Sequence, residues 1–336
     1  MNGLLSETSR RPETQHFADR LYAAIARTGS PVVVGLDPRV DSLPAPLVTA
    51  CVQEYGATLQ GAAEALWRFN REIIDAVHDL VPAVKPQLAF YERYGIAGMR
   101  AFARTVQYAH EVGLLVIADA KRNDIGSTAE AYADAFLGTS MVAGQALTSE
   151  FVVDALTVNA YLGSDGLRPF VERASQYGKG LFVLLKTSNV SSDELQDLQI
   201  DGRPLYEHLG ALVEAWGAAC RGACGYAAVG AVVGATYPEQ GRRLRALLPH
   251  TWFLVPGYGV QGATAPDVAG CFDAAGHGAL VNASRSILFA YREAPYATQY
   301  GPEAYAEAAR AATQRMIRDI RQALEERPPT VDADVV

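Results

Sequence analysis

The sequence predicts an α/β protein built as a single (β/α)8 TIM barrel. Two observations carry this prediction: short, nearly continuous apolar runs recur along the chain, and a helical pattern follows each of them. Strands that are buried on both faces of a parallel sheet have this pattern, and eight of them in alternation with helices favour a closed barrel. A doubly wound open sheet is the alternative. It is disfavoured because no glycine-rich dinucleotide-binding fingerprint follows the first run, where the sequence is GLDPRVDSLP.

Most of the eight predicted strands are rich in Val, Leu or Ile. In chain order they are PVVVGLD (31–37), PAVKPQ (82–87), LLVIADAK (114–121), ALTVNA (155–160), GLFVLLKTS (180–188), AAVGAVVGAT (227–236), TWFLVPGYG (251–259) and HGALVNAS (277–284). Two connections are longer than a minimal barrel needs. We therefore expect insertions after the first strand, within residues 38–81, and after the fifth, within residues 189–226.

Helices are also predicted near both ends of the chain. Phe17, Leu21 and Ile25 have helical spacing before the first strand, and they mark an N-terminal helix that could close the bottom of the barrel. The last helix is expected to run to about Glu326. We expect one catalytic barrel domain over residues 13–326, with a flexible N-terminus at 1–12 and a flexible tail at 327–336.

The composition excludes several classes of protein. Hydrophobic residues make up 49% of the 336 residues and charged residues 20%, which excludes collagen-like, disordered and disulfide-scaffold proteins. The net charge of −8 provides no overall positive field that would attract nucleic acid or an anionic membrane. The chain also contains no run of roughly 18 apolar residues, the length needed to span a bilayer. The N-terminal sequence lacks the apolar region of a secretory signal, so we expect a cytoplasmic protein with free cysteines.

Polar side chains at the ends of the predicted strands are the candidate functional residues, because active sites of such barrels lie at the carboxyl ends of the strands. These residues are Asp37, Lys85, Asp119, Lys121, Thr187, Ser188, Thr236, Gln261 and Arg285. Any one of them could form a salt bridge at the barrel rim. Lysines and aspartates at consecutive strand ends are harder to explain in this way.

The densest cluster is ADAKRNDIGSTAEAY, residues 118–132. Asp119 and Lys121 are two residues apart, so they point to the same face of an extended strand. Asp124 follows where the strand should end, and Lys85 comes from the neighbouring strand. An array of alternating charge keeps each lysine protonated and fixed, because a nearby carboxylate favours the ammonium form. Such a lysine is a poor Schiff-base nucleophile but a good proton donor to a developing carbanion.

The segment DAKRNDIGST resembles the D-x-K-x-x-D-I-x-x-T signature of the orotidine 5′-phosphate decarboxylase family. VGLDP, AVKPQ, TVNAYLG, LLKTSN, PGYGVQG and NASR resemble segments of that family in the same order, over about residues 31–290. The details are closest to its longer, second bacterial subgroup (type 2). The resemblance implies a homodimeric lyase of pyrimidine biosynthesis that converts orotidine 5′-phosphate to UMP and CO2. No metal or other cofactor is expected.

The resemblance also implies roles for residues of the array and its surroundings. Asp37 would hydrogen-bond the ribose, and Lys85 would contact the ribose and join the array. Asp119 would lie near the substrate carboxylate, and Lys121 would protonate C6. Ser188 would recognise the pyrimidine ring of the substrate.

Further residues are implied in phosphate binding and in a shared site. Gln261 and Arg285 would bind the phosphate, helped by the backbone near Ser284. This agrees with the general rule that phosphate binds after strands seven and eight of such barrels. Asp124 and Thr128 would reach across a dimer interface into the site of the partner subunit.

Three alternatives remain. A metal-dependent sugar-phosphate decarboxylase or hexulose-phosphate synthase of the same superfamily would need acidic ligands near the second strand, where no acid precedes Glu92. A Schiff-base aldolase using Lys85, Lys121 or Lys186 would need a lysine of depressed pKa, and carboxylates beside the array lysines oppose that. A non-catalytic nucleotide-binding barrel would be expected to lack Lys121 or one of the aspartates.

Overall fold

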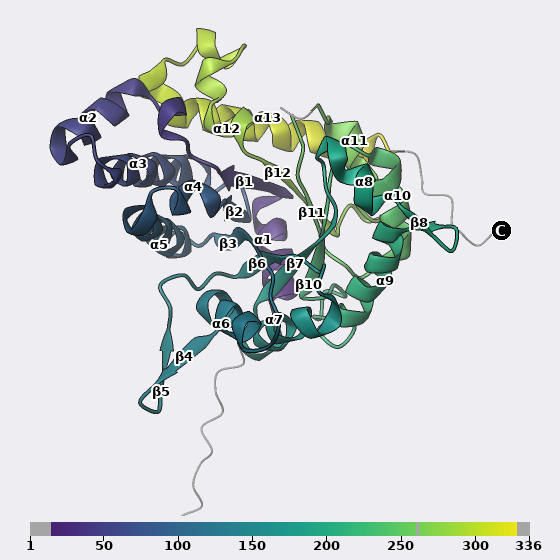
Figure 1. The fold of residues 1–336 in the computed structure, drawn as a ribbon. Coiled ribbons are helices and arrows are strands. Elements are labelled where there is room, and N and C mark those ends of the chain that lie inside the picture. Colours follow the sequence, from purple (N-terminus) through teal and green to yellow (C-terminus); the bar gives the residue numbers. More distant parts are fainter. Residues whose placement is uncertain (1–14, 260–261, 328–336) are drawn as a thin grey trace, which may run out of the picture.

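Eight parallel strands close into a barrel in this computed structural model, which describes residues 15–259 and 262–327. The strands are β1 (Val32–Leu36), β2 (Ala83–Pro86), β3 (Leu115–Arg122), β6 (Ala155–Val158), β7 (Gly180–Lys186), β10 (Val229–Val233), β11 (Phe253–Val255) and β12 (Ala279–Ala283). They pair in this order, and β12 pairs with β1 to complete the ring (Figure 1). Each strand coincides with one of the eight apolar runs, and only β3 extends past its run, by the single residue Arg122, so the predicted (β/α)8 barrel is confirmed.

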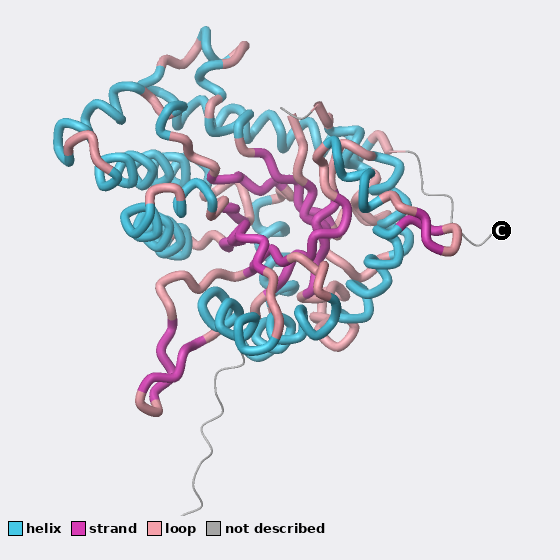
Figure 2. The backbone as a smooth tube through the Cα atoms, in the orientation of Figure 1, coloured by secondary structure: helices cyan, strands magenta, loops and turns pink. Residues whose placement is uncertain are grey.

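Helices surround the strands on the outside of the barrel, as Figure 2 shows. The longer ones are α3 (Leu59–Val77), α5 (Gly95–Glu111), α6 (Gly126–Leu137), α7 (Gly163–Tyr177), α9 (Leu205–Gly217), α10 (Pro238–Leu247) and α13 (Tyr305–Glu325). Shorter ones are α4 (Ala89–Glu92), α11 (Ala265–Ala269) and α12 (Arg285–Leu288). Helix α3 buries apolar side chains that recur at helical spacing, among them Leu66, Phe69 and Ile73.

Helix α1 (Phe17–Thr28) closes the amino-terminal end of the barrel, as the sequence predicts. Phe17 and Leu21 are fully buried against side chains from inside the barrel, and the Phe17 ring meets that of Phe182 edge-on with centroids 6.2 Å apart. Gly180 makes this possible, because a Cβ at that position would lie 2.2 Å from the Phe17 ring. The helix therefore docks where β7 has no side chain.

Both predicted insertions are present. After β1 the chain forms η1 (Val40–Ser42) and α2 (Ala45–Tyr55) before it reaches α3. After β7 it forms η2 (Val190–Ser192), α8 (Asp193–Gln196) and a small antiparallel pair, β8 (Gln199–Ile200) and β9 (Arg203–Pro204). Three further short helices, η3 (Ala290–Arg292), η4 (Tyr296–Thr298) and η5 (Pro302–Ala304), join α12 to α13.

A hairpin between α6 and β6 was not predicted from the sequence, and neither was the small β8–β9 pair. The hairpin strands β4 (Thr139–Val142) and β5 (Gln145–Thr148) pair antiparallel and stand away from the barrel at the lower left of Figure 1. The turn between them uses Ala143 and Gly144, both with positive φ, and that geometry suits a two-residue hairpin turn. Most residues of the hairpin are exposed, so they need not be apolar. Its sequence therefore has no continuous apolar run that would predict a strand.

The ends of the predicted domain lie close to the ends of the described residues. Helix α13 stops at Glu325, near the predicted end, and the guanidinium of Arg327 donates to the carbonyls of Ala269, Phe272 and Asp273. Residues 1–12, and 328–336 of the predicted tail, lie outside the described residues, so their flexibility stays a prediction. Among the helices that the structure describes, none combines the length and apolar character needed to cross a membrane. All four cysteines are free.

Candidate active site

The carboxylate of Asp119 is the centre of the candidate site, at the carboxyl ends of β2, β3 and β6. The Lys85 ammonium donates to its Oδ2 at 2.7 Å, and the Lys121 ammonium donates to its Oδ1 at 2.6 Å. The Gln87 amide adds a bond to Oδ2 and the Thr157 hydroxyl a bond to Oδ1, both at 3.0 Å. Each carboxylate oxygen therefore has two donors, which fix its orientation.

Asp119 and Lys85 hold each other in their charged forms. Burial by itself would raise the pKa of Asp119, but Lys85 and Lys121 hold that pKa far below its ordinary value. Burial would likewise lower the pKa of Lys85, yet the carboxylates of Asp119 and Asp37 raise it above the usual range. The Lys85 side chain is only 6% exposed, whereas the Lys121 side chain is 45% exposed. Lys121 is therefore the ammonium that a bound molecule can reach.

Lys121 lies in an irregular part of β3. Its φ of 49° is in the left-handed region, which costs a residue with a Cβ roughly 1–2 kcal/mol. The pairing of β3 with β6 also shifts register between Ala118 and Arg122. The spacing of Asp119 and Lys121 in the sequence predicts that they share one face of a regular strand. Their side chains do meet, but through this bulge rather than through simple alternation.

Asp124 and Thr128 are not joined to the array within the described residues of their own chain. An Asp124 carboxylate oxygen accepts the backbone N–H of Ile125 at 2.8 Å. Ile125 is the N-cap of α6, and Thr128 lies exposed in the first turn of that helix. The structure thus assembles three members of the predicted four-residue array, Lys85, Asp119 and Lys121.

Asp37 directly follows β1 and lies close enough to Lys85 to raise its pKa, and Ser284 directly follows β12. Within the described part of the chain, Oδ1 of Asp37 and Oδ1 of Asn282 are buried without a hydrogen-bond partner. A Cβ on Gly35 would lie 2.0 Å from Ser284 Oγ and 3.1 Å from Asn282 Oδ1, so only glycine fits there. Buried acceptors of this kind need a donor, and a bound ligand can supply it.

Ser188 lies half-buried after β7, beside the end of β10. Its backbone passes so close to Gly234 that a Cβ there would come within 2.8 Å, and its carbonyl accepts the Thr236 hydroxyl at 3.3 Å. An ion pair also fastens the insertion after β7 to the end of that strand. The Lys186 ammonium is fully buried at the end of β7 and pairs with Asp197 of the insertion at 2.9 Å. Thr187 and Ser188 are therefore held on a fixed loop at the rim of the barrel.

Arg285, the first residue of α12, is exposed at the candidate phosphate position. It lines a cavity of about 590 Å³ together with Gly259, Ser286 and Arg292. The guanidinium groups of Arg285 and Arg292 thus line a cavity that also borders Gly259, in the loop after β11. Gln261, the other predicted phosphate ligand, lies outside the described residues, so its place stays a prediction.

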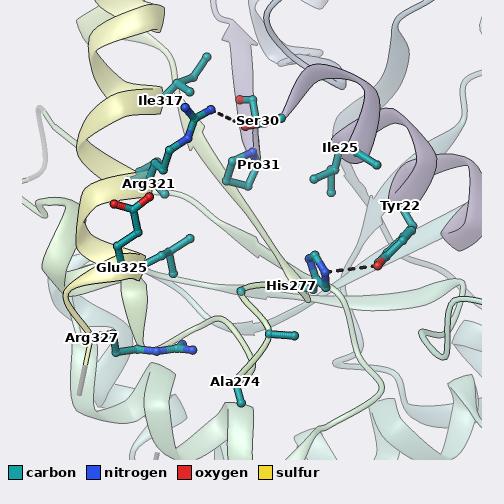
Figure 3. Close-up of a pocket in the computed structure, with 16 residues that line it drawn as sticks. Tyr22, Ile25, Ser30, Pro31, Ala274, His277, Ile317, Arg321, Glu325 and Arg327 are labelled. Atoms are coloured by element: carbon teal, nitrogen blue, oxygen red, sulfur yellow. Dashed lines mark hydrogen bonds between the residues drawn. The ribbon is translucent and has the colours of Figure 1, made fainter. Parts of the chain in front are cut away.

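A second cavity, of about 410 Å³, lies at the opposite end of the barrel (Figure 3). Its lining includes Pro31, just before β1, and His277, just before β12, so it opens at the amino ends of the strands. His277 is within hydrogen-bond distance of the Tyr22 hydroxyl of α1, and Arg321 of α13 donates to the Gly29 carbonyl. This cavity contains none of the predicted site residues, so the chemistry belongs to the other end.

Three polar residues of the site were not predicted from the sequence: Gln87, Thr157 and Asn282. Gln87 and Thr157 donate to Asp119, and Asn282 presents a buried, unpartnered acceptor within the described part of the chain. Each is uncharged, and each stands in or next to a run that otherwise reads as apolar strand. The sequence could have indicated each of them as a single polar residue in a predicted strand. Because side chains alternate along a strand, these positions face the barrel interior.

Comparison with known proteins gives consistent matches. The sequence model of the "Orotidine 5'-phosphate decarboxylase / HUMPS family" matches residues 30–300. An orotidine 5′-phosphate decarboxylase of Rhodopirellula baltica is 47% identical over 91% of this chain and 99% of its own length. One of Caldicellulosiruptor bescii is 41% identical over 82% of this chain and 90% of its own. The solved OMP decarboxylase of Leishmania donovani superposes with a TM-score of 0.69 at 30% identity, covering 93% of this chain and all of that one.

Proposed function

We propose that this chain, which belongs to the orotidine 5′-phosphate decarboxylase / HUMPS family, converts orotidine 5′-phosphate to UMP and CO2. The observation that carries the proposal is the array itself: a buried Asp119 carboxylate fixed between the ammonium groups of Lys85 and Lys121. The similarity to decarboxylases over nearly the whole chain supports the same reaction.

Lys121 is the proton donor in this proposal. The bond between C6 of the pyrimidine and its carboxylate breaks, the electron pair stays on C6, and CO2 leaves. No adjacent carbonyl fully delocalises that electron pair, so a fixed positive charge near C6 stabilises it. The Lys121 ammonium then transfers a proton to C6 and becomes a neutral amine, which solvent can protonate again because the side chain is 45% exposed.

Asp119 acts on the departing group. Its negative charge is fixed by four donors and lies next to Lys121, so it would stand beside the substrate carboxylate when C6 faces that lysine. Repulsion between the two carboxylates raises the energy of the bound substrate and is relieved as CO2 forms. The same four donors prevent Asp119 from escaping the repulsion by rotation.

The remaining site residues bind parts of the substrate away from the reacting bond. The unpartnered Asp37 oxygen can accept a ribose hydroxyl, Ser188 can hydrogen-bond the pyrimidine, and Arg285 can bind the phosphate together with Gln261 and the backbone near Ser284. An arginine–phosphate contact is charge-assisted and can be bidentate. Binding energy from the phosphate can then orient C6 at Lys121.

We further propose that the enzyme is a cytoplasmic homodimer whose two active sites are shared. The supporting observation is that Asp124 and Thr128 stand outside the array of their own chain, at the start of α6. From there they could complete the array of a partner subunit.

The test is a decarboxylation assay on the purified chain. Loss of absorbance of orotidine 5′-phosphate should occur, should persist after exhaustive chelation with EDTA, and should be far faster than with orotidine, which lacks the phosphate. No turnover of orotidine 5′-phosphate would refute the proposed function. Loss of activity in EDTA that Mg²⁺ restores would instead place the chain among metal-dependent members of the superfamily.

A further inference from the structure

Thr157 is the one polar side chain of β6, whose sequence is ALTV. It is 1% exposed and lies between the apolar residues Leu156 and Val158. A buried hydroxyl in a barrel strand must find hydrogen-bond partners, because an unpaired one costs free energy. The partners that Thr157 finds are both parts of the array.

The neighbouring strand β3 has a bulge beside Thr157. Ala118 pairs with Leu156, and the next pair is Arg122 with Val158, so four residues of β3 advance while β6 advances two. The extra residues include Asp119 and Lys121. A bulge of this kind turns side chains in a new direction and interrupts the backbone ladder. Here it also holds Lys121 at a φ of 49°, which the surroundings must stabilise.

The Thr157 hydroxyl replaces the missing ladder contact. The backbone N–H of Lys121 donates to Thr157 Oγ1 at 3.0 Å, and Thr157 Oγ1 donates to Asp119 Oδ1 at 3.0 Å. Because the oxygen accepts the Lys121 N–H, its own proton is directed to the carboxylate. One hydroxyl thus links the bulged backbone of Lys121 to the oxygen that the Lys121 ammonium also contacts.

We propose that Thr157 is a positioning residue for the decarboxylation: its hydroxyl holds the Lys121 backbone and the Asp119 carboxylate in one fixed arrangement, so that the Lys121 ammonium is aimed at C6. The inference rests on the proposed function. Thr157 acts only through Asp119 and Lys121. Without the hydroxyl, the Lys121 N–H loses its acceptor and Asp119 loses one of its four donors, so both groups can leave the reactive geometry.

The test compares variants with and without the hydroxyl. Thr157→Val keeps the shape of the side chain but makes neither hydrogen bond, and Thr157→Ser keeps the hydroxyl. Thr313→Val is the matched control, because Thr313 is also fully buried but donates to the Ala309 carbonyl within the outer helix α13. Each variant is assayed for kcat and KM with orotidine 5′-phosphate, for the Kd of UMP, and for Tm.

Thr157→Val should lower kcat about a hundredfold, as expected for misplaced reacting groups, and should change KM and the Kd of UMP by less than about threefold. Thr157→Ser should restore most of the lost kcat. Thr313→Val should lower Tm but leave kcat unchanged. A role in folding alone would lower Tm and would leave the kcat of the folded fraction intact.

The outcomes separate this inference from the function on which it rests. If the wild-type chain does not decarboxylate orotidine 5′-phosphate, both are refuted. If the wild type is active and folded Thr157→Val keeps its kcat within about threefold, or Thr157→Ser is as impaired as Thr157→Val, the positioning role alone is refuted. Should Thr157→Val not fold, Thr157→Ala replaces it. If neither folds, Thr157 serves the fold rather than the reaction, and the inference is overturned.

Discussion

Three features of Lys121 support the proposal that it donates the proton to C6. Its ammonium is paired with Asp119 at 2.6 Å, which fixes its position. Its side chain remains accessible, whereas Lys85 is buried on the other side of the same carboxylate. Its backbone is held in a left-handed conformation by the bulge of β3. Strained residues persist only where surrounding structure determines them, and they cluster at functional sites.

Replacing the donor should abolish turnover without unfolding the protein. Lys121→Ala should lower kcat by about 10⁴-fold or more, since both the proton donor and a charge that stabilises the carbanion are lost. The Kd of UMP and the Tm, measured alongside kcat, should show a folded protein that still binds nucleotide. Arg168→Ala is the control, because it removes an exposed cation that pairs with Glu172 at 4.0 Å on α7. A folded Lys121→Ala that keeps a tenth of wild-type activity would exclude the assignment.

Charge made the centre of the site predictable from the sequence. Lys85, Asp119 and Lys121 were found because ionisable residues rarely end buried apolar strands, and the structure brings all three together. Thr157 and Asn282 were missed, because a lone threonine or asparagine in a strand is commonly structural. The bulge at Lys121 also left no trace in the sequence, since it depends on the register between β3 and β6.

At the scale of elements, Asp154 fastens α1 to the base of the barrel. It directly precedes β6 and is 4% exposed. Its carboxylate accepts from the Arg20 guanidinium of α1 at 2.6 Å, from His110 of α5 at 2.9 Å and from the backbone N–H of Val116 at 2.9 Å. Burial would raise the pKa of Asp154, but His110, Lys179 and Arg20 hold it far below its ordinary value.

The depressed pKa of Asp154 makes this contact sensitive to acid. A carboxyl whose folded-state pKa lies below its unfolded-state value of about 3.9 stabilises the fold above that value, and the contribution is lost as the pH falls toward the folded-state pKa. Asp154→Asn should therefore lower the free energy of unfolding by roughly 3 kcal/mol at pH 7, because Arg20 and Lys179 lose a buried counter-charge. Urea unfolding should show this difference shrinking below about pH 4.

The control for Asp154 is Asp41→Asn. Asp41 pairs with Arg39 at 3.0 Å in an exposed position, where an ion pair contributes little, so the variant should unfold like the wild type at pH 7. Folded Asp154→Asn should keep its kcat, because the residue lies at the end of the barrel opposite the array. A destabilisation of equal size at every pH would show that the charge of Asp154 is not its cause.

The predictability of each element depended on how much of it is buried. Every barrel strand was recognised, because burial on both faces leaves a continuous apolar run. Helix α1 was recognised from the spacing of Phe17, Leu21 and Ile25, which pack against the barrel interior. The hairpin of β4 and β5 was missed, because its side chains, among them Met141 and Val142, are exposed and carry no such pattern.

At the scale of the whole molecule, the described residues of one chain bring together three of the four residues of the predicted array. Lys85, Asp119 and Lys121 meet within one chain, while Asp124 stands apart at the start of α6 and accepts from the adjacent backbone. If Asp124 belongs to the site of a partner subunit, each active site uses the lysines of one chain and the Asp124 of the other. A two-fold symmetric dimer allows this sharing, because both subunits use the same surface patch in the interface. Each subunit can therefore contribute its Asp124 to the site of the other.

Two inactive variants should then restore activity to each other. In a heterodimer of Lys121→Ala and Asp124→Ala, one site carries both lesions and the other carries neither. Random mixing of equal amounts makes about half of the dimers heterodimers, so roughly a quarter of wild-type activity should return. The measurement is the decarboxylation rate after mixing, once mass spectrometry has confirmed that subunits have exchanged.

The matched control is a mixture of Lys121→Ala with Asp119→Ala. Both residues belong to the array of their own chain, where their side chains are 2.6 Å apart, so every site in that heterodimer keeps one lesion. This mixture should regain nothing whether or not sites are shared. If the mixture with Asp124→Ala also regains nothing after confirmed exchange, Asp124 acts within its own chain. It would then have to move from its contact with the Ile125 backbone toward Lys121 when substrate binds.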